Sequence, residues 1–484
     1  MNCWRTAAIT FLKANAVHGK MMQLVKDRSP RNPVLIALIT MSLLPLGVLG
    51  VAMYQSALVA IRGAAFQRVE LASDLIANTV SLGYAELAAE LQVTASLPRV
   101  ETTSAELIRG FREFETKSVD EDRVREELLS YYTTAADENK GSEQSEDSHR
   151  MIGPKADASI KALKGPGLIL HDLYVRSNSN GSGKKSLLDD AGDGSAYSVG
   201  HAELHPVMRS IKQRLRLYDV LLLDATTRDV VYSVNKGRDY GVGFTSNALQ
   251  QTGPVDAVDI LLDGSIKNGF TCVDYAMYGP AGIPVLSLAT LVQSEGNVSG
   301  VLLFLVSFDQ LDRMISKSNT TSGSVSYEVY GDKWTRATGG ETLKPRPHVF
   351  VSDEAQQKFT AFTNSKSYTS GSADGAQSLL CSASVKSICP QAVNSEIVWM
   401  LAATTPEEDV MASAFAVKVF GQMVFGVTAV AILLSAFILA RLLTKRHAEQ
   451  LRLAEMVTNT SVQLVQADAE LEVVYLNQIG RAHV

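Results

Sequence analysis

The sequence predicts an α+β fold: a two-span membrane protein with a long stalk helix and two antiparallel-sheet domains outside the cytoplasm. Two apolar runs, residues 33–54 and 419–440, bracket a longer and mostly polar middle. Each run matches the ~20 helical residues that cross a ~30 Å hydrocarbon core. A helical pattern follows the first run, and strand patterns fill much of the rest. We therefore expect transmembrane helices at 34–54 and 419–440 with a folded region between them.

Basic residues beside both runs predict their orientation. Residues 1–33 contain many Lys and Arg but a single acid, Asp27, and Arg441, Lys445 and Arg446 follow the second run. Because Lys and Arg are enriched on the cytoplasmic side, both ends are expected in the cytoplasm and the middle outside it. A cleaved signal peptide is the alternative for the first run, although residues 54–57 (YQSA) form only a weak cleavage site. A buried soluble helix is the alternative for the second.

Composition excludes one class of partner and limits covalent cross-linking. The net charge is −6 and 46% of the residues are hydrophobic, so no basic field indicates binding to nucleic acid. Among the four cysteines, Cys381 and Cys389 lie close together in a segment that should face an oxidising compartment. A disulfide between Cys381 and Cys389 is one expectation, and two separate buried thiols are the other.

A long amphipathic helix is expected directly after the first span. Apolar residues recur at steps of three and four, which predicts a stalk that buries one stripe against its own domain or against a second copy of the chain; they are Leu58, Ile61, Ala65, Val69, Ala72, Ile76, Val80, Leu87 and Leu91. Further helix is expected at 105–132. Residues 138–162, rich in Glu, Ser, Gly and Lys, indicate a mobile insertion. Residues 55–160 thus form the stalk, a helical region and this insertion.

Strand patterns divide the remainder into two regions. Residues 218–224 (YDVLLLD) and 230–234 (VVYSV) predict a hairpin, and three more strands and a helix follow at 269–277, 284–292, 299–307 and 309–315. Five antiparallel strands with helices on one side are expected for this region, residues 161–316. A second, smaller set of strands, at 324–330, 378–384 and 397–403, is expected for residues 317–412.

Several motifs in this order resemble the double Cache (dCache) sensor region of bacterial receptors, including methyl-accepting chemotaxis proteins. They are residues 187–206 (LLDDAGDGSAYSVGHAELHP), YDVLLLD, DVVYSV, the DYG at 239–241, VDYAMYGPAG and VWMLAATTPEE. The resemblance implies two stacked PAS-like (Cache) domains, membrane-distal at 161–316 and membrane-proximal at 317–412. The same exterior occurs on chemoreceptors, histidine kinases and nucleotide cyclases, so the resemblance implies a sensor without naming its output.

The ligand-binding residues expected from this resemblance are Asp274, Tyr275, Tyr278 and Tyr240. Amino-acid-sensing members of the family use a Tyr, Arg, Trp, Tyr and Asp set, but GVGFTSNALQ after Tyr240 lacks the Arg-Trp-Tyr run, and Tyr278 stands where the amine-binding acid would be. We expect Asp274, Tyr275 and Tyr278 at the rim of the sheet, faced by Tyr240. Aromatic walls with one carboxylate suit a small cationic or polar metabolite. The alternative is that the tyrosines pack in the core and Asp274 caps a turn.

Other chemistry is not indicated. His201 and His205 are spaced i, i+4 and could share a helix face as metal ligands, but no third ligand or H-E-x-x-H motif accompanies them. A helix cap and turn before Pro206 is the expected use of this pair, and no metal site is predicted. The sequence contains no nucleophile elbow, P-loop or dinucleotide fingerprint, so no catalytic residue and no cofactor are expected in this chain.

The last segment predicts the start of an intracellular module. Residues 441–456 are expected to form a signalling linker helix. Residues 456–477 (MVTNTSVQLVQADAELEVVYLN) resemble the opening hairpin of a PAS domain, with strands at 462–467 and 473–476, so 457–478 is interpreted as a truncated PAS start. The pattern breaks at residues 479–484 (IGRAHV), which match one reading frame of a common sequencing adapter and are expected to be a non-native tail.

These expectations together describe a two-pass sensory receptor of a bacterial inner membrane with a periplasmic sensor domain. It would bind a small molecule, or a ligand-loaded binding protein, and pass the signal through the lipid bilayer as a homodimer. The leading hypothesis is a non-enzymatic chemoreceptor that acts on a cytoplasmic kinase and adaptor. A sensor histidine kinase or nucleotide cyclase is the first alternative, and a membrane-anchored binding module is the second.

Overall fold

The structure, a computed structural model, describes the chain in segments that are listed here by number: 31–138, 159–247, 249, 252–263, 269–280, 282–318, 325–331, 334–339, 349–350, 367–371, 377–389, 397–459, 465–467 and 473–476. The expected mobile insertion lies mostly outside these residues, as do most of the N-terminal segment 1–33 and the whole tail 479–484. The described residues divide into two compact units. One is Ala65–Asp409, and the other combines the residues before and after it.

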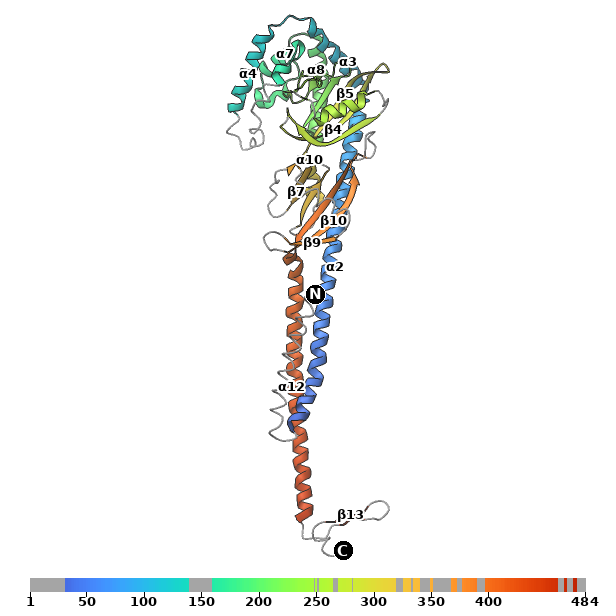
Figure 1. Cartoon of the computed structure of the whole chain (residues 1–484), viewed down its shortest axis with the longest axis vertical. Helices are drawn as coiled ribbons and strands as arrows, with labels where there is room; N and C mark the ends of the chain where they lie inside the picture. Colours follow the sequence, from blue (N-terminus) through green and yellow to red (C-terminus); the bar gives the residue numbers. More distant parts are fainter. Residues whose placement is uncertain are drawn as a thin grey trace. The chain divides into compact units, whose positions relative to one another are not determined.

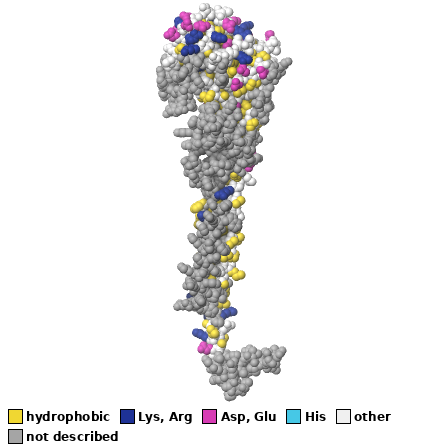
Figure 2. Space-filling view, viewed as in Figure 1, with side chains coloured by type: hydrophobic (Ala, Val, Ile, Leu, Met, Phe, Trp, Pro, Cys, Tyr) yellow, Lys and Arg dark blue, Asp and Glu magenta, His cyan; other side chains and the backbone are white. Residues whose placement is uncertain are grey.

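Two long helices carry the apolar runs. Helix α2 is Arg31–Ala95 and helix α12 is Glu407–Asn459 (Figure 1). Among the described residues, Ile39–Ala95 and Phe415–Met456 are long and apolar enough to cross a membrane, with peak mean hydropathies of 1.8 and 2.5. Their apolar side chains are exposed, as Figure 2 shows along these helices. Such exposure would be unfavourable in water, so both helices are compatible with a lipid environment.

The expected extensions of both helices are present. Helix α2 continues through residue 54 without a break and buries Val69, Ile76, Val80 and Leu87 from the predicted stripe. Helix α12 continues past residue 441 to Asn459, as expected for the linker. Beyond it, β12 (Val465–Ala467) and β13 (Val473–Leu476) pair antiparallel, which confirms the predicted hairpin.

A five-stranded antiparallel sheet forms the centre of the larger unit. Its order is β2-β1-β5-β4-β3, and β3 and β2 are therefore its two edges. The strands are β1 (Asp219–Asp224), β2 (Val230–Ser233), β3 (Phe270–Tyr278), β4 (Ile283–Ser294) and β5 (Asn297–Ser307). These five strands and their antiparallel pairing confirm the prediction for this region.

Both faces of this sheet are covered, so the expectation of helices on one side is wrong. On β5, Leu302 and Phe304 join one apolar core, whereas Val301 and Leu303 join another. Because successive side chains of a strand point to opposite faces, the two cores lie on opposite sides of the sheet. The uninterrupted apolar run of β5 is the physical reason, since a strand buried on both faces has no polar side to alternate.

Helices from several parts of the chain provide this cover. Residues of α2, α3 and α8 enter the first core, and residues of α4 and α9 enter the second. The bounds are α3 (Pro98–Glu113), η1 (Phe114–Thr116), α4 (Glu121–Glu138), α7 (Gly165–His171), η3 (Asp172–Arg176), η4 (Ser182–Leu187), α8 (Ala196–Leu215), α9 (Gly253–Leu262) and α10 (Phe308–Ser318). Helices α3 and α8 approach closely, because a Cβ on Gly110 would lie 2.5 Å from the backbone nitrogen of Tyr197.

A second antiparallel sheet follows in the same unit, with the order β8-β7-β6-β11-β10-β9. Its strands are β6 (Ser326–Tyr330), β7 (Trp334–Gly339), β8 (Val349–Phe350), β9 (Ser367–Gly371), β10 (Gln377–Ser387) and β11 (Val398–Pro406). The sequence predicted β6, β10 and β11 but not the three other strands. Strand β11 ends at Pro406, and α12 begins at the next residue.

Candidate functional site

The four predicted ligand-binding residues have different surroundings. Asp274 is half-buried on β3, and its Oδ1 accepts hydrogen bonds from the Trp399 indole N–H at 3.0 Å and the Tyr275 backbone N–H at 2.7 Å. The Tyr275 hydroxyl is buried, lies 2.7 Å from the Tyr84 hydroxyl and donates to the Ser307 carbonyl at 3.0 Å. These contacts join β3 to α2 and β11.

The other two predicted residues lie among a different set of side chains. The Tyr240 hydroxyl is 2.6 Å from the Tyr197 hydroxyl, and the rings of His171 and Tyr174 lie beside the Tyr240 ring. The Tyr278 hydroxyl donates to Asp239 at 2.6 Å. Both tyrosines are fully buried. Their assignment as ligand-binding residues stays a prediction.

Tyr278 belongs to a buried network that we call the polar cluster. It joins the five-stranded sheet to α8, to η4 and to the loop after β2, and its members are Lys185, His205, Asp219, Tyr232, Lys236, Asp239 and Tyr278. All except Lys185 are less than 4% exposed. Buried charges cost free energy unless they are paired and hydrogen-bonded, so this concentration of ionisable groups requires an explanation.

Lys236 is the most unusual member. Its side chain is fully buried, and its backbone φ of 54° is in the left-handed region, where a residue with a Cβ is strained. Two backbone contacts hold this conformation: the Lys236 N–H donates to Ser233 Oγ at 2.8 Å, and the Lys185 ammonium donates to the Lys236 carbonyl at 2.8 Å. Strained residues of this kind concentrate at functional sites.

The ammonium of Lys236 lies beside histidine rather than a carboxylate. Its Nζ is 3.1 Å from Nε2 of His205 and 5.8 Å from the centroid of the Tyr174 ring. Burial, opposed by the charge of Asp219, lowers the pKa of Lys236 to about 7. Among the described residues, no carboxylate oxygen lies within salt-bridge distance of this Nζ.

His205 is held on both sides of its ring. Nδ1 is 2.7 Å from the Tyr232 hydroxyl, and Nε2 is 2.7 Å from the Ser186 carbonyl as well as close to Lys236. Burial, reinforced by the charge of Lys236, lowers the pKa of His205 to about 3, so the ring is neutral. A neutral ring has one N–H, and Nε2 can therefore either donate to Ser186 or accept from Lys236, but not both.

Two acids complete the network. Asp219 accepts from the Ser233 hydroxyl at 2.7 Å and from the Asn235 backbone N–H at 3.0 Å. Burial raises the pKa of Asp219, and the nearby charge of Asp239 raises it further. Burial also raises the pKa of Asp239, against the hydrogen bond from Tyr278. The cluster therefore contains both basic and acidic groups whose charges are sensitive to a change in their surroundings.

The histidine pair does not have the predicted local structure. Both rings are buried inside α8, which runs through Pro206 to Leu215, so the expected cap and turn before Pro206 are wrong. Ser195 is the actual N-cap, because its hydroxyl accepts from the Ser198 backbone N–H. The rings of His201 and His205 stack at 4.5 Å. Within the described part of the chain, no group of three His, Cys, Asp or Glu is arranged to hold a metal ion.

The predicted disulfide is also wrong in its pairing. Cys389 is bonded to Cys272 of β3, with their Cα atoms 6.3 Å apart. A sulfur atom forms one disulfide, so Cys381 is not the partner. Separation along the sequence favoured the nearer cysteine, whereas the packing of two sheets in one unit brings the distant cysteine to Cys389.

Sequence reasoning missed most of the polar cluster. It selected Tyr278 and discussed His205, but Lys185, Asp219, Lys236 and Asp239 were not recognised. Asp219 and Lys236 flank the two strands of the β1–β2 hairpin, where polar residues usually indicate exposed strand ends. The only available signal was Asp219 at the start of a strand that is otherwise apolar up to Asp224.

Comparisons with known proteins place the fold among sensor domains. No protein-family model and no curated protein matches the sequence. Among solved structures, an extracellular ligand binding receptor from Desulfohalobium retbaense matches 49% of this chain with 14% identity and a TM-score of 0.28; the match spans 37% of that receptor's own length.

Two further matches represent the two signalling classes. The sensor domain of the V. cholerae histidine kinase DctB matches 57% of this chain and 98% of its own, with 10% identity and a TM-score of 0.29. The ligand-binding domain of the Pseudomonas aeruginosa amino acid chemoreceptor PctB, in complex with L-Arg, matches 42% of this chain and 82% of its own, with 12% identity and a TM-score of 0.26. Sensor domains of chemoreceptors and histidine kinases are the classes that the sequence resemblance implies.

Proposed function

We propose that this chain is a transmembrane sensory receptor, which binds a small molecule outside the cytoplasm and transmits the signal across the inner membrane. Its two sheets would be the stacked membrane-distal and membrane-proximal Cache domains, and α2 and α12 would each cross the bilayer once. The β12–β13 hairpin would open a cytoplasmic PAS domain. Chemoreception is the leading output, with a cytoplasmic kinase and adaptor as partners.

The observation that carries the proposal is the polar cluster inside a domain bracketed by two exposed apolar helices. Folding alone does not favour a buried lysine in a strained conformation beside a neutral histidine, because apolar residues of similar volume would cost less. A ligand that contacts these groups would compensate part of that cost. Ionisable groups in such an environment are candidates for a binding site.

The chemistry of the cluster indicates the class of ligand. The Lys236 ammonium and the tyrosine hydroxyls can donate hydrogen bonds to an anionic group, while Asp219 and Asp239 can accept them from a cationic one. A small polar metabolite that carries an acidic group, a basic group or both is therefore the proposed ligand. This differs from the sequence-based hypothesis, in which Asp274 supplied the carboxylate.

Two alternatives keep the same sensor and change the output. A histidine kinase or nucleotide cyclase would carry an enzymatic module after the PAS start, and a membrane-anchored binding module would carry none. The complete reading frame downstream of residue 476 distinguishes them. A long heptad-patterned helical hairpin supports the chemoreceptor, and a nucleotide-binding domain supports an enzyme.

Ligand binding is tested with the full chain purified in detergent. We expect its thermal stability to rise with at least one member of a panel of amino acids, amines and small carboxylates, by ~2.7 kcal/mol at a hundredfold excess over Kd. Lys236→Met should abolish that rise, because it removes the buried ammonium at nearly constant volume. Lys184→Met, which changes an exposed lysine nearby, should preserve it. If no compound stabilises the protein, or if both variants respond like the unmodified chain, the proposed site is wrong.

A further inference from the structure

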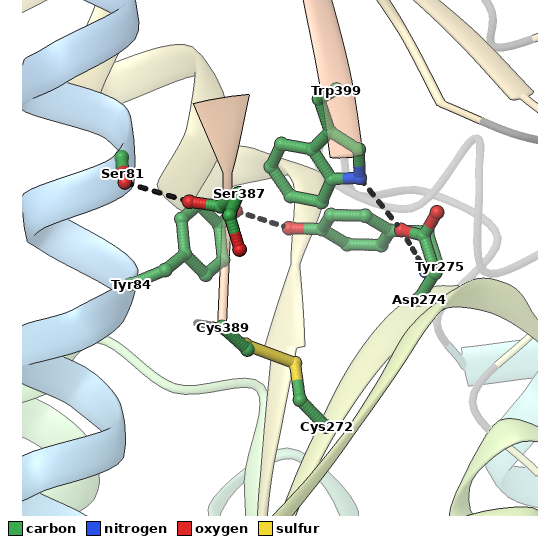
Figure 3. Close-up of a disulfide and its surroundings, with 8 residues drawn as sticks. All are labelled: Ser81, Tyr84, Cys272, Asp274, Tyr275, Ser387, Cys389 and Trp399. Atoms are coloured by element: carbon green, nitrogen blue, oxygen red, sulfur yellow. Dashed lines mark hydrogen bonds between the residues drawn. A yellow bond between two sulfur atoms is a disulfide. The ribbon is translucent and has the colours of Figure 1, made fainter. Parts of the chain in front are cut away.

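Three parts of the larger unit meet around the disulfide, at a place that we call the junction. Helix α2 contributes Ser81 and Tyr84, and β3 contributes Cys272, Asp274 and Tyr275 (Figure 3). The six-stranded sheet and the residues after β10 contribute Ser387, Cys389 and Trp399. Edge strand β3 of one sheet is thus fixed both to the other sheet and to the long helix.

The contacts at the junction are of several kinds. The Cys272–Cys389 disulfide is covalent, and the Trp399 indole N–H donates to Asp274 at 3.0 Å. The Tyr84 ring meets the Trp399 ring edge-on at 5.1 Å. The Ser81 hydroxyl donates to the Ser387 carbonyl at 2.8 Å. Cys272, Cys389 and Trp399 are at most 3% exposed, so the junction is a packed interior rather than a surface contact.

The same strand also ends at the polar cluster. Tyr278, the last residue of β3, donates to Asp239, whereas Asp274 lies four positions earlier and accepts from Trp399. Between these two contacts the register of β3 against β4 shifts at Val273 and Ala276, which marks a bulge. A bulge interrupts the ladder and allows a strand to bend locally, so the Tyr278 end can shift relative to β4 without breaking the whole pairing.

On the other side of the junction, the chain continues directly toward the second apolar helix. Trp399 is the second residue of β11, and β11 leads to Pro406, after which α12 begins. A displacement of Trp399 is therefore a displacement of the strand that precedes α12. The contacts of β3 and the course of the chain form one continuous physical route from Asp239 to Glu407.

We propose that β3 is the coupling strand of this receptor: it passes a change at the polar cluster to β11 through the Cys272–Cys389 disulfide and the Asp274–Trp399 hydrogen bond. This inference rests on the proposed sensory function and assigns Asp274 and Tyr275 to transmission instead of ligand contact. The disulfide holds β3 to the residues before β11, and the hydrogen bond holds β3 to β11 itself. Energetic coupling between sites needs such a linked element, and it must be measured rather than inferred from proximity.

Trp399 supplies a direct probe of this coupling. The chain has three tryptophans, and Trp4→Phe with Trp334→Phe leaves Trp399 alone. In the full chain labelled with ¹⁵N-tryptophan and held in detergent, the single indole N–H resonance then reports on the hydrogen bond to Asp274. Tyr278→Phe removes the hydroxyl at the polar-cluster end of β3. We expect it to move the Trp399 resonance by more than its line width.

A matched control uses the opposite edge of the same sheet. Tyr232 of β2 is equally buried and is also bonded to a polar-cluster residue, His205, so Tyr232→Phe deletes the same atom without touching β3. It should leave the resonance in place. A shift as large as that of Tyr278→Phe, or no shift from Tyr278→Phe, overturns the proposal.

The disulfide is tested in the same background. In Cys272→Ala/Cys389→Ala, the shift caused by Tyr278→Phe should fall by at least half, and an unchanged shift removes the disulfide from the route. If that double variant does not fold, Asp274→Asn provides the second arm, because it weakens the other link and should also reduce the shift. No ligand is used, so this experiment can fail while the ligand screen succeeds, and the reverse.

Discussion

At the scale of single residues, Lys236 has the most measurable consequence. Its pKa falls from 10.5 in the unfolded chain to about 7 in the folded protein, because burial disfavours the charged form. Between these values the unfolded state binds more protons than the native state, so stability increases with pH across this window. The lysine therefore destabilises the fold most below about pH 7 and least above about pH 10.

Replacing Lys236 with methionine should remove this dependence. We expect Lys236→Met to be more stable than the unmodified protein, by a difference that grows by ~1.4 kcal/mol for each unit from pH 10 down to pH 7 and then levels off. Chemical denaturation in detergent at several pH values measures it. Lys184→Met should show no such trend, because that lysine is exposed. A difference for Lys236→Met that is constant with pH would contradict the buried-lysine account.

Asp274 separates a structural role from a ligand-binding role. Because Asp274 accepts the Trp399 indole N–H in a half-buried position, Asp274→Ala should reduce the unfolding free energy by ~1.5–3 kcal/mol without any ligand present. A residue kept only for ligand contact would change it by less than ~0.5 kcal/mol.

A double-mutant cycle shows whether the effect comes from that hydrogen bond. Trp399→Phe removes the donor and keeps an aromatic ring, so the combination with Asp274→Ala should cost ~1 kcal/mol less than the sum of the single changes. Additive losses would mean that Asp274 stabilises the fold through something other than Trp399.

At the scale of elements, α2 shows two distinct faces. One face is buried in its own domain, as the sequence predicts. On the other face, Leu71, Leu75 and Leu82 are between 56% and 73% exposed. With Asn78 between them, the steps are four, three and four residues, the spacing of a coiled-coil seam. This stripe lies in the folded unit, beyond the apolar run at 33–54, so lipid is not expected to cover it, and the expected homodimer would bury it.

Cysteine cross-linking tests this seam. In a protein with Cys3→Ser and Cys381→Ser, we expect Leu82→Cys to form a disulfide-linked dimer in membranes under mild oxidation, because the two copies of a seam residue face each other. Thr79→Cys, on the flank of the stripe, should cross-link at least several-fold less. Equal yields at both positions, or none at either, would argue against a parallel dimer along α2.

Individual elements also show why prediction succeeded or failed. Strands β4 and β5 were found because their β-rich runs are long and bounded by turn residues, but the same runs concealed their two-sided burial. Strands β7, β8 and β9 were missed because short sequences such as WTRATG and SYTSG have little apolar alternation. Their strand structure depends on pairing with β6 and β10, which no local pattern reveals.

At the scale of the whole molecule, patterns local in sequence predicted the architecture, whereas contacts distant in sequence formed the site. The two apolar helices, the continuous α2 and the five-stranded sheet follow from periodicity. The polar cluster joins residues 185 to 278, and the disulfide joins Cys272 to Cys389 across 117 positions. Such contacts depend on how the sheets and helices pack, and a single sequence carries no direct signal for that packing.

The central claim is that the sheet-containing unit lies outside the cytoplasm, between two membrane-spanning helices. Fusions to alkaline phosphatase, which is active only outside the cytoplasm, test this claim most directly when they are made after residue 300 and after Gln450 in bacterial cells. The account predicts high activity for the fusion after residue 300 and background activity for the fusion after Gln450, with equal amounts of both proteins in the membrane fraction. The reverse pattern, or high activity at both positions, would contradict it.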